Sequence, residues 1–123
     1  MGIFDRVRRS FSGASAGTGG LRGMSDEDIA YLEGWVSERA GVEGYVEPET
    51  FVNQLTVVLV AKDGEWTRRR VGTAKTARKL GQRLSVPMYD VQKTGYPQRM
   101  RDHNERQRIL ERRERARRDQ QSR

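Results

Sequence analysis

The side chains in this sequence that are best suited to binding chemistry are cations, and they are densest in the stretch EWTRRRVGTAKTARKL, from Glu65 to Leu80. Three consecutive arginines stand just before a segment in which Lys75, Lys79 and Arg83 recur every four residues, which is one face of a helix. Like charges at this spacing repel one another, and Lys75 also opposes the positive end of the helix dipole. Because a bound anion would relieve both effects, the pattern predicts phosphate contacts.

The same cations have a second interpretation, in which they are solvated or are paired inside the protein. Glu65, Asp90 and an acidic first helix are the neighbours that could neutralise the row. Only four of the 24 basic residues are lysine, so the composition strongly favours arginine. Arginine forks suit phosphates and planar bases, whereas a GC-rich genome produces the same bias through codon usage alone.

A second basic run occupies the C-terminal tail, RMRDHNERQRILERRERARRDQQSR. Acids precede bases by four residues in this tail, at Asp102–Arg106, Glu111–Arg115 and Glu114–Arg118, and this spacing supports a solvated helix from about Gln98 to Gln120. Such an arm could lie on DNA, RNA or anionic lipid. The candidate nucleic-acid contacts are Arg68, Arg69, Arg70, Lys75, Arg78, Lys79 and Arg83 in the domain, and Arg112, Arg113, Arg115, Arg117 and Arg118 in the tail.

Catalytic and metal-binding chemistry has little support in the sequence. There is no cysteine, and the single histidine, His103, lies in the charged tail without residues that complete a triad or a metal site of three ligands. Asp90 follows a short predicted strand, where a carboxylate is more often a cap than a catalyst. We therefore expect a protein that is not an enzyme, with no cofactor, no metal and no small-molecule substrate.

The formal net charge of +7 is distributed unevenly along the 123 residues. Residues 24–50 carry a net −7, residues 51–61 carry no charge, and residues 62–123 carry a net +11. This asymmetry predicts an electric field that attracts polyanions to one side of the molecule. DNA or RNA is the expected partner, in a cytoplasmic location that could include the nucleoid or a membrane surface.

The N-terminal segment, residues 1–11, places Ile3, Phe4, Val7 and Phe11 on one helical stripe among arginines. This basic amphipathic pattern can lie on an anionic membrane, is too short to span one, and could equally dock on the protein's own core. A peripheral membrane-surface adaptor is therefore the main alternative function, and a protein–protein interaction module is the other. Residues 12–24 are rich in Gly and Ser and predict a flexible linker.

The elements that position the domain cations are expected to begin at Ser25, which matches a helix N-cap. The domain is then expected to span residues 25–96, with the charged tail at 97–123. A short strand is expected at Val42–Val46. A second strand, Phe51–Ala61, is expected to be central because it is apolar on both faces.

A two-residue turn at Asp63-Gly64 predicts a hairpin that sets Arg68 opposite Leu59 and turns Arg69 to the other face. Thr73 is then expected to cap a helix that ends at Leu84, and a short edge strand follows. The fold class is predicted to be α+β, with a small antiparallel-centred sheet packed by two helices and a long charged C-terminal helix.

The order of helix, three strands and helix across Ser25 to Leu84 resembles a double-stranded RNA-binding domain. Gly72-Thr73-Ala74-Lys75-Thr76-Ala77-Arg78-Lys79 is similar to the glycine and basic start of that family's second helix. The resemblance implies that Lys75, Arg78 and Lys79 touch phosphates across a groove. The paired lysines of the family's motif are absent from this chain.

The segments EWTRRR, from Glu65 to Arg70, and GYPQRMR, from Gly95 to Arg101, resemble small basic actinobacterial proteins of unknown function, and that resemblance implies no activity. The leading hypothesis is therefore non-enzymatic, sequence-nonspecific nucleic-acid binding. It would use a basic strand–helix surface, with the arginine-rich tail as an auxiliary arm.

Overall fold

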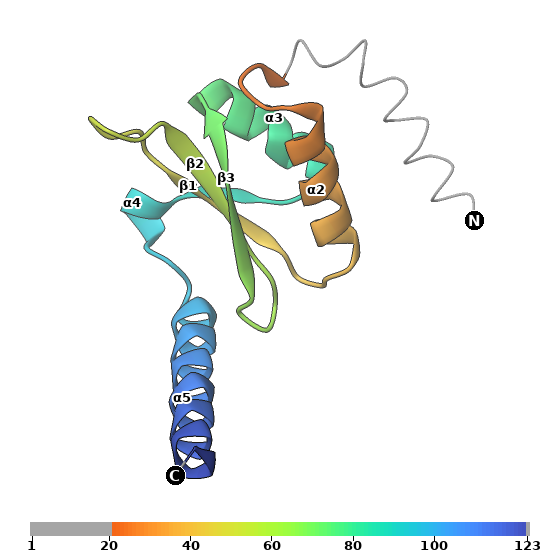
Figure 1. The fold of residues 1–123 in the computed structure, drawn as a ribbon. Helices are drawn as coiled ribbons and strands as arrows, with labels where there is room; N and C mark the ends of the chain where they lie inside the picture. The colour runs from red at the N-terminus through yellow and green to blue at the C-terminus, as the bar shows by residue number, and fades with distance from the viewer. Residues whose placement is uncertain (1–20, 123) are drawn as a thin grey trace, which may run out of the picture.

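A computed structural model of the chain describes residues 21–122, which form an α+β fold with one four-stranded sheet and, in this part of the chain, four α-helices. Figure 1 shows α2 and α3 packed against the sheet and α5 extending away from it. In chain order the elements are α2 (Asp26–Ser37), β1 (Glu43–Glu47), β2 (Leu55–Val60), β3 (Trp66–Gly72), α3 (Ala74–Leu84), β4 (Met88–Asp90), α4 (Val91–Thr94) and α5 (Gln98–Gln121).

The sheet is mixed rather than purely antiparallel. Its strand order is β3-β2-β1-β4, so β2 is central, as expected, and the pairs β1–β2 and β2–β3 are antiparallel. The antiparallel expectation fails at β4, which pairs parallel with β1 and sets Tyr89 opposite Tyr45. β3 and β4 consequently run in the same direction, and strands related in this way need a crossover connection, which α3 supplies.

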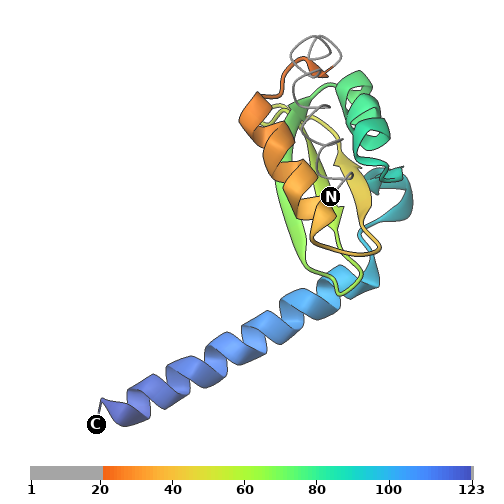
Figure 2. The ribbon, with the colours of Figure 1, turned by 90° about the vertical axis from the view of Figure 1, so that its right-hand side faces the viewer.

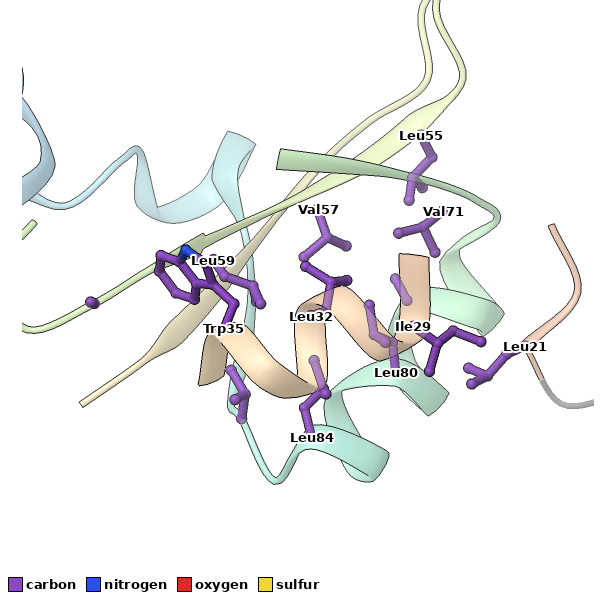
Figure 3. Packing of buried hydrophobic residues seen from close by; sticks show 13 residues of the cluster. Leu21, Ile29, Leu32, Trp35, Leu55, Val57, Leu59, Val71, Leu80 and Leu84 are labelled. Carbon is purple, nitrogen blue, oxygen red and sulfur yellow. The ribbon is translucent and has the colours of Figure 1, made fainter. Parts of the chain in front are cut away.

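The main core lies between the sheet and the two helices α2 and α3. Figure 3 shows side chains of both helices meeting those of β2 and β3, and Leu32, Leu59 and Leu80 in this cluster are fully buried. Leu21 is buried in the same cluster. Among the described residues, the packed part of the chain therefore includes Leu21, which precedes Ser25. Leu21 is a large apolar side chain within the predicted linker, and burying it stabilises the fold by about 1.5–3 kcal/mol.

Both helix starts follow their local capping signals. Ser25 Oγ accepts from the Asp28 N–H at 3.1 Å, and Thr73 Oγ1 accepts from the Thr76 N–H at 3.1 Å. Each bond satisfies one of the N–H groups that the first turn of a helix leaves without a backbone partner. These two caps fix where α2 and α3 begin, and the cap at Thr73 thereby sets the positions of the basic residues along α3.

The β2–β3 hairpin closes through a three-residue turn, Lys62 to Gly64, so the expected two-residue turn is wrong. The Ala61 N–H donates to the Glu65 carbonyl oxygen at 2.8 Å, and the Gly64 N–H donates to the Ala61 carbonyl oxygen at 3.0 Å. Gly64 has a φ of +94°, the left-handed conformation that completes hairpin turns of this length.

This turn shifts the strand register by one residue and so exchanges the faces of β3. Arg68 lies opposite Val58, whereas the two-residue turn predicted Leu59. Trp66 and Arg68 consequently face away from α2 and α3, while Thr67 faces α2 and shares a hydrogen bond of 3.1 Å with the Tyr31 hydroxyl.

β2 begins at Leu55, later than the expected start at Phe51. Phe51 and Val52 instead stand almost fully exposed in the β1–β2 loop. Thr50 and Asn53 close a turn around them, because the Thr50 N–H donates to the Asn53 carbonyl oxygen at 2.8 Å and the Asn53 N–H donates to Thr50 Oγ1 at 3.1 Å. This local side-chain hydrogen bonding competes with the extended strand and overrides the apolar pattern.

The long C-terminal helix forms where it was expected, from Gln98 to Gln121. Its first turns pack on the sheet face opposite to α2 and α3, where Met100 is buried against Val58 and Val60 and Trp66 Nε1 donates to Asn104 Oδ1 at 2.8 Å. Figures 1 and 2 both show the rest of α5 leaving the domain. The charged tail is therefore partly a packed element of the domain.

Polar contacts hold the start of α5 against the hairpin. Arg99 Nε donates to the Ala61 carbonyl oxygen at 2.9 Å, and Arg99 Nη2 donates to Glu43 Oε1 at 2.6 Å. Arg106 Nη2 donates to the Asp63 carbonyl oxygen at 3.0 Å, which replaces the ion pair with Asp102 that the spacing predicted. The turn and the helix therefore stabilise each other.

Gly64→Ala is expected to lower the free energy of unfolding by about 1–3 kcal/mol and to weaken the docking of α5. An added Cβ would lie 2.0 Å from the Arg99 carbonyl oxygen, and alanine disfavours a φ of +94°. Chemical denaturation followed by tryptophan fluorescence measures the change.

Gly34→Ala is the matched control, because a Cβ on Gly34 meets nothing within 4 Å. Alanine in this helix interior should stabilise by about 0.5–1 kcal/mol. Equal destabilisation by the two substitutions would contradict the role assigned to the turn.

Candidate nucleic-acid interface

The consecutive arginines of β3 do not form one surface, because they alternate between the faces of the sheet. Arg68 makes a bidentate ion pair with Glu47, with Nε 2.7 Å from Oε1 and Nη2 3.0 Å from Oε2. The Arg68 guanidinium also stacks 5.2 Å from the centre of the Trp66 ring. The aliphatic part and charge of Arg68 are therefore used within the protein.

Arg69 lies on the other face of β3 and is held by α2. Its guanidinium stacks 3.9 Å from the centre of the Tyr31 ring, and its Nε lies 3.5 Å from Asp28 Oδ1. Arg69 Nη1 also donates to the Arg68 carbonyl oxygen at 2.7 Å. This bond occupies a backbone acceptor of β3, an edge strand, and makes that edge less available for pairing with another chain.

Glu47 collects four donor groups and ties three strands to the segment before α5. Besides the pair with Arg68, it accepts from Thr56 Oγ1 at 2.6 Å and from the Tyr96 hydroxyl. Burial by itself raises the pKa of the Glu47 carboxyl, but the hydrogen bonds from Arg68, Thr56 and Tyr96 outweigh burial and hold this pKa below its ordinary value of 4.5. Burial and the neighbouring Glu47 raise the pKa of Tyr96.

Arg83, the last member of the predicted row, is neutralised by the acidic first helix. Arg83 Nε donates to Glu33 Oε1 at 3.0 Å, and the two side chains are only 20% and 15% exposed. The ion pair joins α3 to α2, so Arg83 serves packing between the helices. The other acids considered act elsewhere, since Glu65 pairs with Arg39 at 2.9 Å and Asp90 caps α4 by accepting from the Gln92 N–H.

The start of α3 carries the domain cations that stay available. Within residues 21–122, Lys75, Arg78 and Lys79 make no ion pair, and the first turn of α3 contains no acid. Lys75 and Arg78 are exposed, and Lys79 is half-buried. Arg22 is exposed and joins them, because its carbonyl oxygen accepts from Thr76 Oγ1 at 2.9 Å. We call Arg22, Lys75, Arg78 and Lys79 the α3 cluster.

The sequence pattern does not single out Arg22, because it lies in the predicted linker that is rich in Gly and Ser. The signal that could have found it is Leu21, the large apolar residue beside it. Once Leu21 is buried in the core, the next residue must follow the surface at the start of α3. The cluster therefore draws on two segments that are more than fifty residues apart in the chain.

Arg70 is exposed and makes no ion pair in the part of the chain that the structure describes. Together with Arg68 it lines a groove of about 430 Å³ between β3 and the β1–β2 loop. Thr56, Asn53 and Gln54 line the same groove, so polar side chains from both β2 and the loop face Arg70 across it. Arg70 therefore belongs to the same end of the domain as the α3 cluster, but to the opposite face of the sheet.

The outer half of α5, Arg108–Gln121, is called the α5 arm. Its basic side chains are exposed, and among the pairs predicted at four-residue spacing in the tail only Glu114–Arg118 forms, at 2.9 Å. Helical spacing puts Arg112 and Arg115 on one face of the arm and Arg113 and Arg117 on the opposite face. On two opposite faces, the arm therefore presents arginines that form no ion pair with any described residue.

The α3 cluster and the α5 arm lie toward opposite ends of the domain. α5 begins beside the turn at Gly64, before β3, whereas α3 begins after Gly72, at the other end of β3. β3 alone spans about 20 Å at the usual rise per residue. The structure therefore divides the predicted strand–helix–tail surface into two separate basic regions.

The remaining predicted sites are quickly placed. The candidate membrane residues Ile3, Phe4, Val7 and Phe11 lie outside the described residues. Between residues 21 and 122, acids and the histidine form no group of three or more that could hold a metal ion. No helix in the same range has both the length and the apolar character needed to cross a membrane.

Comparisons with protein-family models, with curated proteins and with solved structures found no match to this chain. The chemistry of its surfaces must therefore be inferred from the side chains themselves.

The Glu47 network predicts a stability that depends on pH. A carboxyl with a lowered folded-state pKa contributes stability above its unfolded-state pKa, near 4.5, and that contribution is lost as the pH falls through the lower folded-state value. Glu47→Gln is therefore expected to cost about 1–3 kcal/mol at neutral pH, and progressively less below pH ~4.5, where the wild-type carboxyl also becomes protonated.

Denaturation of the wild type and the variant at several pH values measures this difference in the free energy of unfolding. Glu49→Gln, in the exposed loop next to the network, is the matched control and should change stability little. A cost for Glu47→Gln that stays constant into strong acid would contradict the assignment.

Proposed function

We propose that this protein binds nucleic acid through phosphate contacts, without base specificity and without catalysis, and that the α5 arm makes the principal contact. The arginines of the α5 arm support this proposal most directly. They are exposed on opposite faces of a helical segment that extends beyond the domain. A helix without a packed face gains little from tertiary burial, so its composition is explained better by a partner than by the fold.

The dimensions of the arm fit the major groove of duplex DNA. A helix with its side chains is about 10–12 Å across, and the B-form major groove is about 12 Å wide. A phosphate strand then lies on each side of the helix. Arg112 and Arg115 would reach one strand, and Arg113 and Arg117 would reach the other. Because the major groove of A-form RNA is too narrow for a helix, the arm favours DNA over RNA duplexes.

The composition of the arm favours affinity without sequence readout. Arginine contacts to phosphates release counterions from the duplex, which supplies binding energy that is independent of sequence. The arm contains no aromatic side chain with which to stack on bases, and its only side-chain amides, Gln120 and Gln121, lie at its C-terminal end. The phosphate contacts of its arginines make the binding sensitive to salt, and the acids Glu111, Glu114 and Asp119 limit its net charge.

The α3 cluster is proposed as a second phosphate contact. Its cations stand at a helix start whose N–H groups also favour anions. The resemblance to double-stranded RNA-binding domains assigns the same role to Lys75, Arg78 and Lys79. Since the cluster and the arm lie toward opposite ends of the domain, they would touch separate segments of nucleic acid or separate partners.

A chain with Arg112→Ala, Arg113→Ala and Arg117→Ala is expected to bind a labelled DNA duplex about 10-fold more weakly at low salt. The slope of log affinity against log salt should fall by about 2–3, because three phosphate contacts are lost. Alanine favours the helix, so the arm keeps its shape. Fluorescence anisotropy at several salt concentrations measures both quantities, with an RNA duplex in parallel.

The matched control carries Lys62→Ala, Lys93→Ala and Arg101→Ala, which remove the same formal charge from exposed positions elsewhere. This control should leave the salt slope nearly unchanged. Equal losses in the arm variant and the control would mean that net charge alone attracts DNA, and would refute the assignment to the arm. Absence of binding at low salt would refute the proposed function itself.

A further inference from the structure

Two apolar side chains stand in solvent at one end of the domain, where the core gives them no cover. Phe51 is 105% exposed and Val52 is 83% exposed. The sequence predicted that both would lie in a buried strand. An exposed phenylalanine in a loop forgoes the free energy that burying its ring would contribute. The loop could gain that free energy by folding back on the domain. The adjacent pair is therefore a candidate contact surface.

The loop is built to keep these side chains outside. The two hydrogen bonds between Thr50 and Asn53 close the turn, so Phe51 and Val52 occupy its two central positions. Figure 1 shows the β1–β2 loop projecting beyond the sheet. We call the turn Thr50–Asn53 the β1–β2 tip. It is a convex, preorganised projection, which suits insertion into a soft surface better than the filling of a groove.

The same end of the domain carries most of the available domain cations. Leu55, just after the tip, pairs with Gly72, which leads directly into α3. Arg70 and the α3 cluster therefore lie behind the tip, on both sides of the sheet. The exposed acids at this end are Asp26, Glu27 and Glu49, which are fewer than the four exposed bases Arg22, Arg70, Lys75 and Arg78. Lys79 beside them is half-buried.

The chain also enters the fold at this end. Leu21 is buried beside α3, and a Cβ on Gly23 would lie 2.9 Å from the Val71 carbonyl oxygen, close to the end of β3. The sequence before Leu21 contains the basic amphipathic stripe of Ile3, Phe4, Val7 and Phe11.

We propose that this end of the domain docks on an anionic lipid bilayer, with Phe51 and Val52 inserted at the boundary between headgroups and acyl chains and the α3 cluster beside lipid phosphates. An adjacent aromatic and aliphatic pair is suited to hydrocarbon, whereas base stacking would use the aromatic ring alone. Cations set back from the tip match the headgroup layer that lies above the acyl chains. The proposal does not depend on the α5 arm, which points away from this surface.

The test uses the full chain and vesicles of phosphatidylcholine with or without phosphatidylserine. Phe51→Ser with Val52→Ser is expected to lower the partition coefficient onto anionic vesicles about 10-fold or more, because both apolar side chains are lost. Anisotropy with labelled DNA should remain at the wild-type level. Leu110→Ser, which removes an exposed apolar side chain from the α5 arm, is the control and should leave vesicle binding unchanged.

A second variant keeps the test independent of folding. Phe51→Trp retains an aromatic tip, and its emission should shift to shorter wavelength and be quenched by brominated acyl chains only when anionic vesicles are present. Unchanged vesicle binding by the serine variant, or no response from the tryptophan variant on vesicles that bind, would overturn the proposal. A loss of DNA binding with vesicle binding retained would overturn it too, and would assign the tip to nucleic acid.

Discussion

The turn at Gly64 is the constraint on which the other features of this protein depend. The turn holds three residues, one more than the shortest hairpin turn, and Gly64 supplies the positive φ that a turn of this length needs. The strand register follows from that one additional residue. Arg68 is thereby set on the face of Glu47, and Arg69 on the face of α2. The same glycine leaves room for the backbone of Arg99, so α5 can pack against the turn. The hairpin therefore decides which partners Arg68 and Arg69 have within the fold, and where α5 packs on the domain.

Ion pairs within the fold reduce the number of basic residues that are available to a partner, so a count of Arg and Lys overestimates the binding surface. The half-buried pairs of Arg68 with Glu47, Arg83 with Glu33 and Arg99 with Glu43 join different elements of the fold. Removing one member would leave the other charge without its partner, which costs more than an exposed pair is worth. The acidic excess of residues 24–50 is thus largely a set of structural counterions. The cations that remain are those for which the fold supplies no acid.

Local signals predicted the elements better than their relations in space. The caps at Ser25 and Thr73, the central position of β2 and the long C-terminal helix are confirmed, because each depends on neighbouring residues. The parallel pairing of β4 depends on where a crossover returns, and no short pattern encodes that. The division between paired and available arginines could not be predicted for the same reason, since each partner comes from another element. The prediction that β2 begins at Phe51 is wrong, because the apolar character of Phe51 favours burial in a strand but does not ensure it.

The packing of α5 on the domain also determines how the α5 arm and the β1–β2 tip are placed relative to each other. Met100 and the bond from Trp66 to Asn104 fix the first turns of the helix, so the arm leaves the domain in a set direction. A preset arm loses less orientational freedom on binding than a flexible tail would. It extends about 20 Å at the rise of an α-helix. The helix that carries it begins beside the end of β3 that is remote from the α3 cluster. A bilayer at the β1–β2 tip would therefore leave the arm in solvent, free to bind nucleic acid at the same time, whereas one short duplex could not reach both regions.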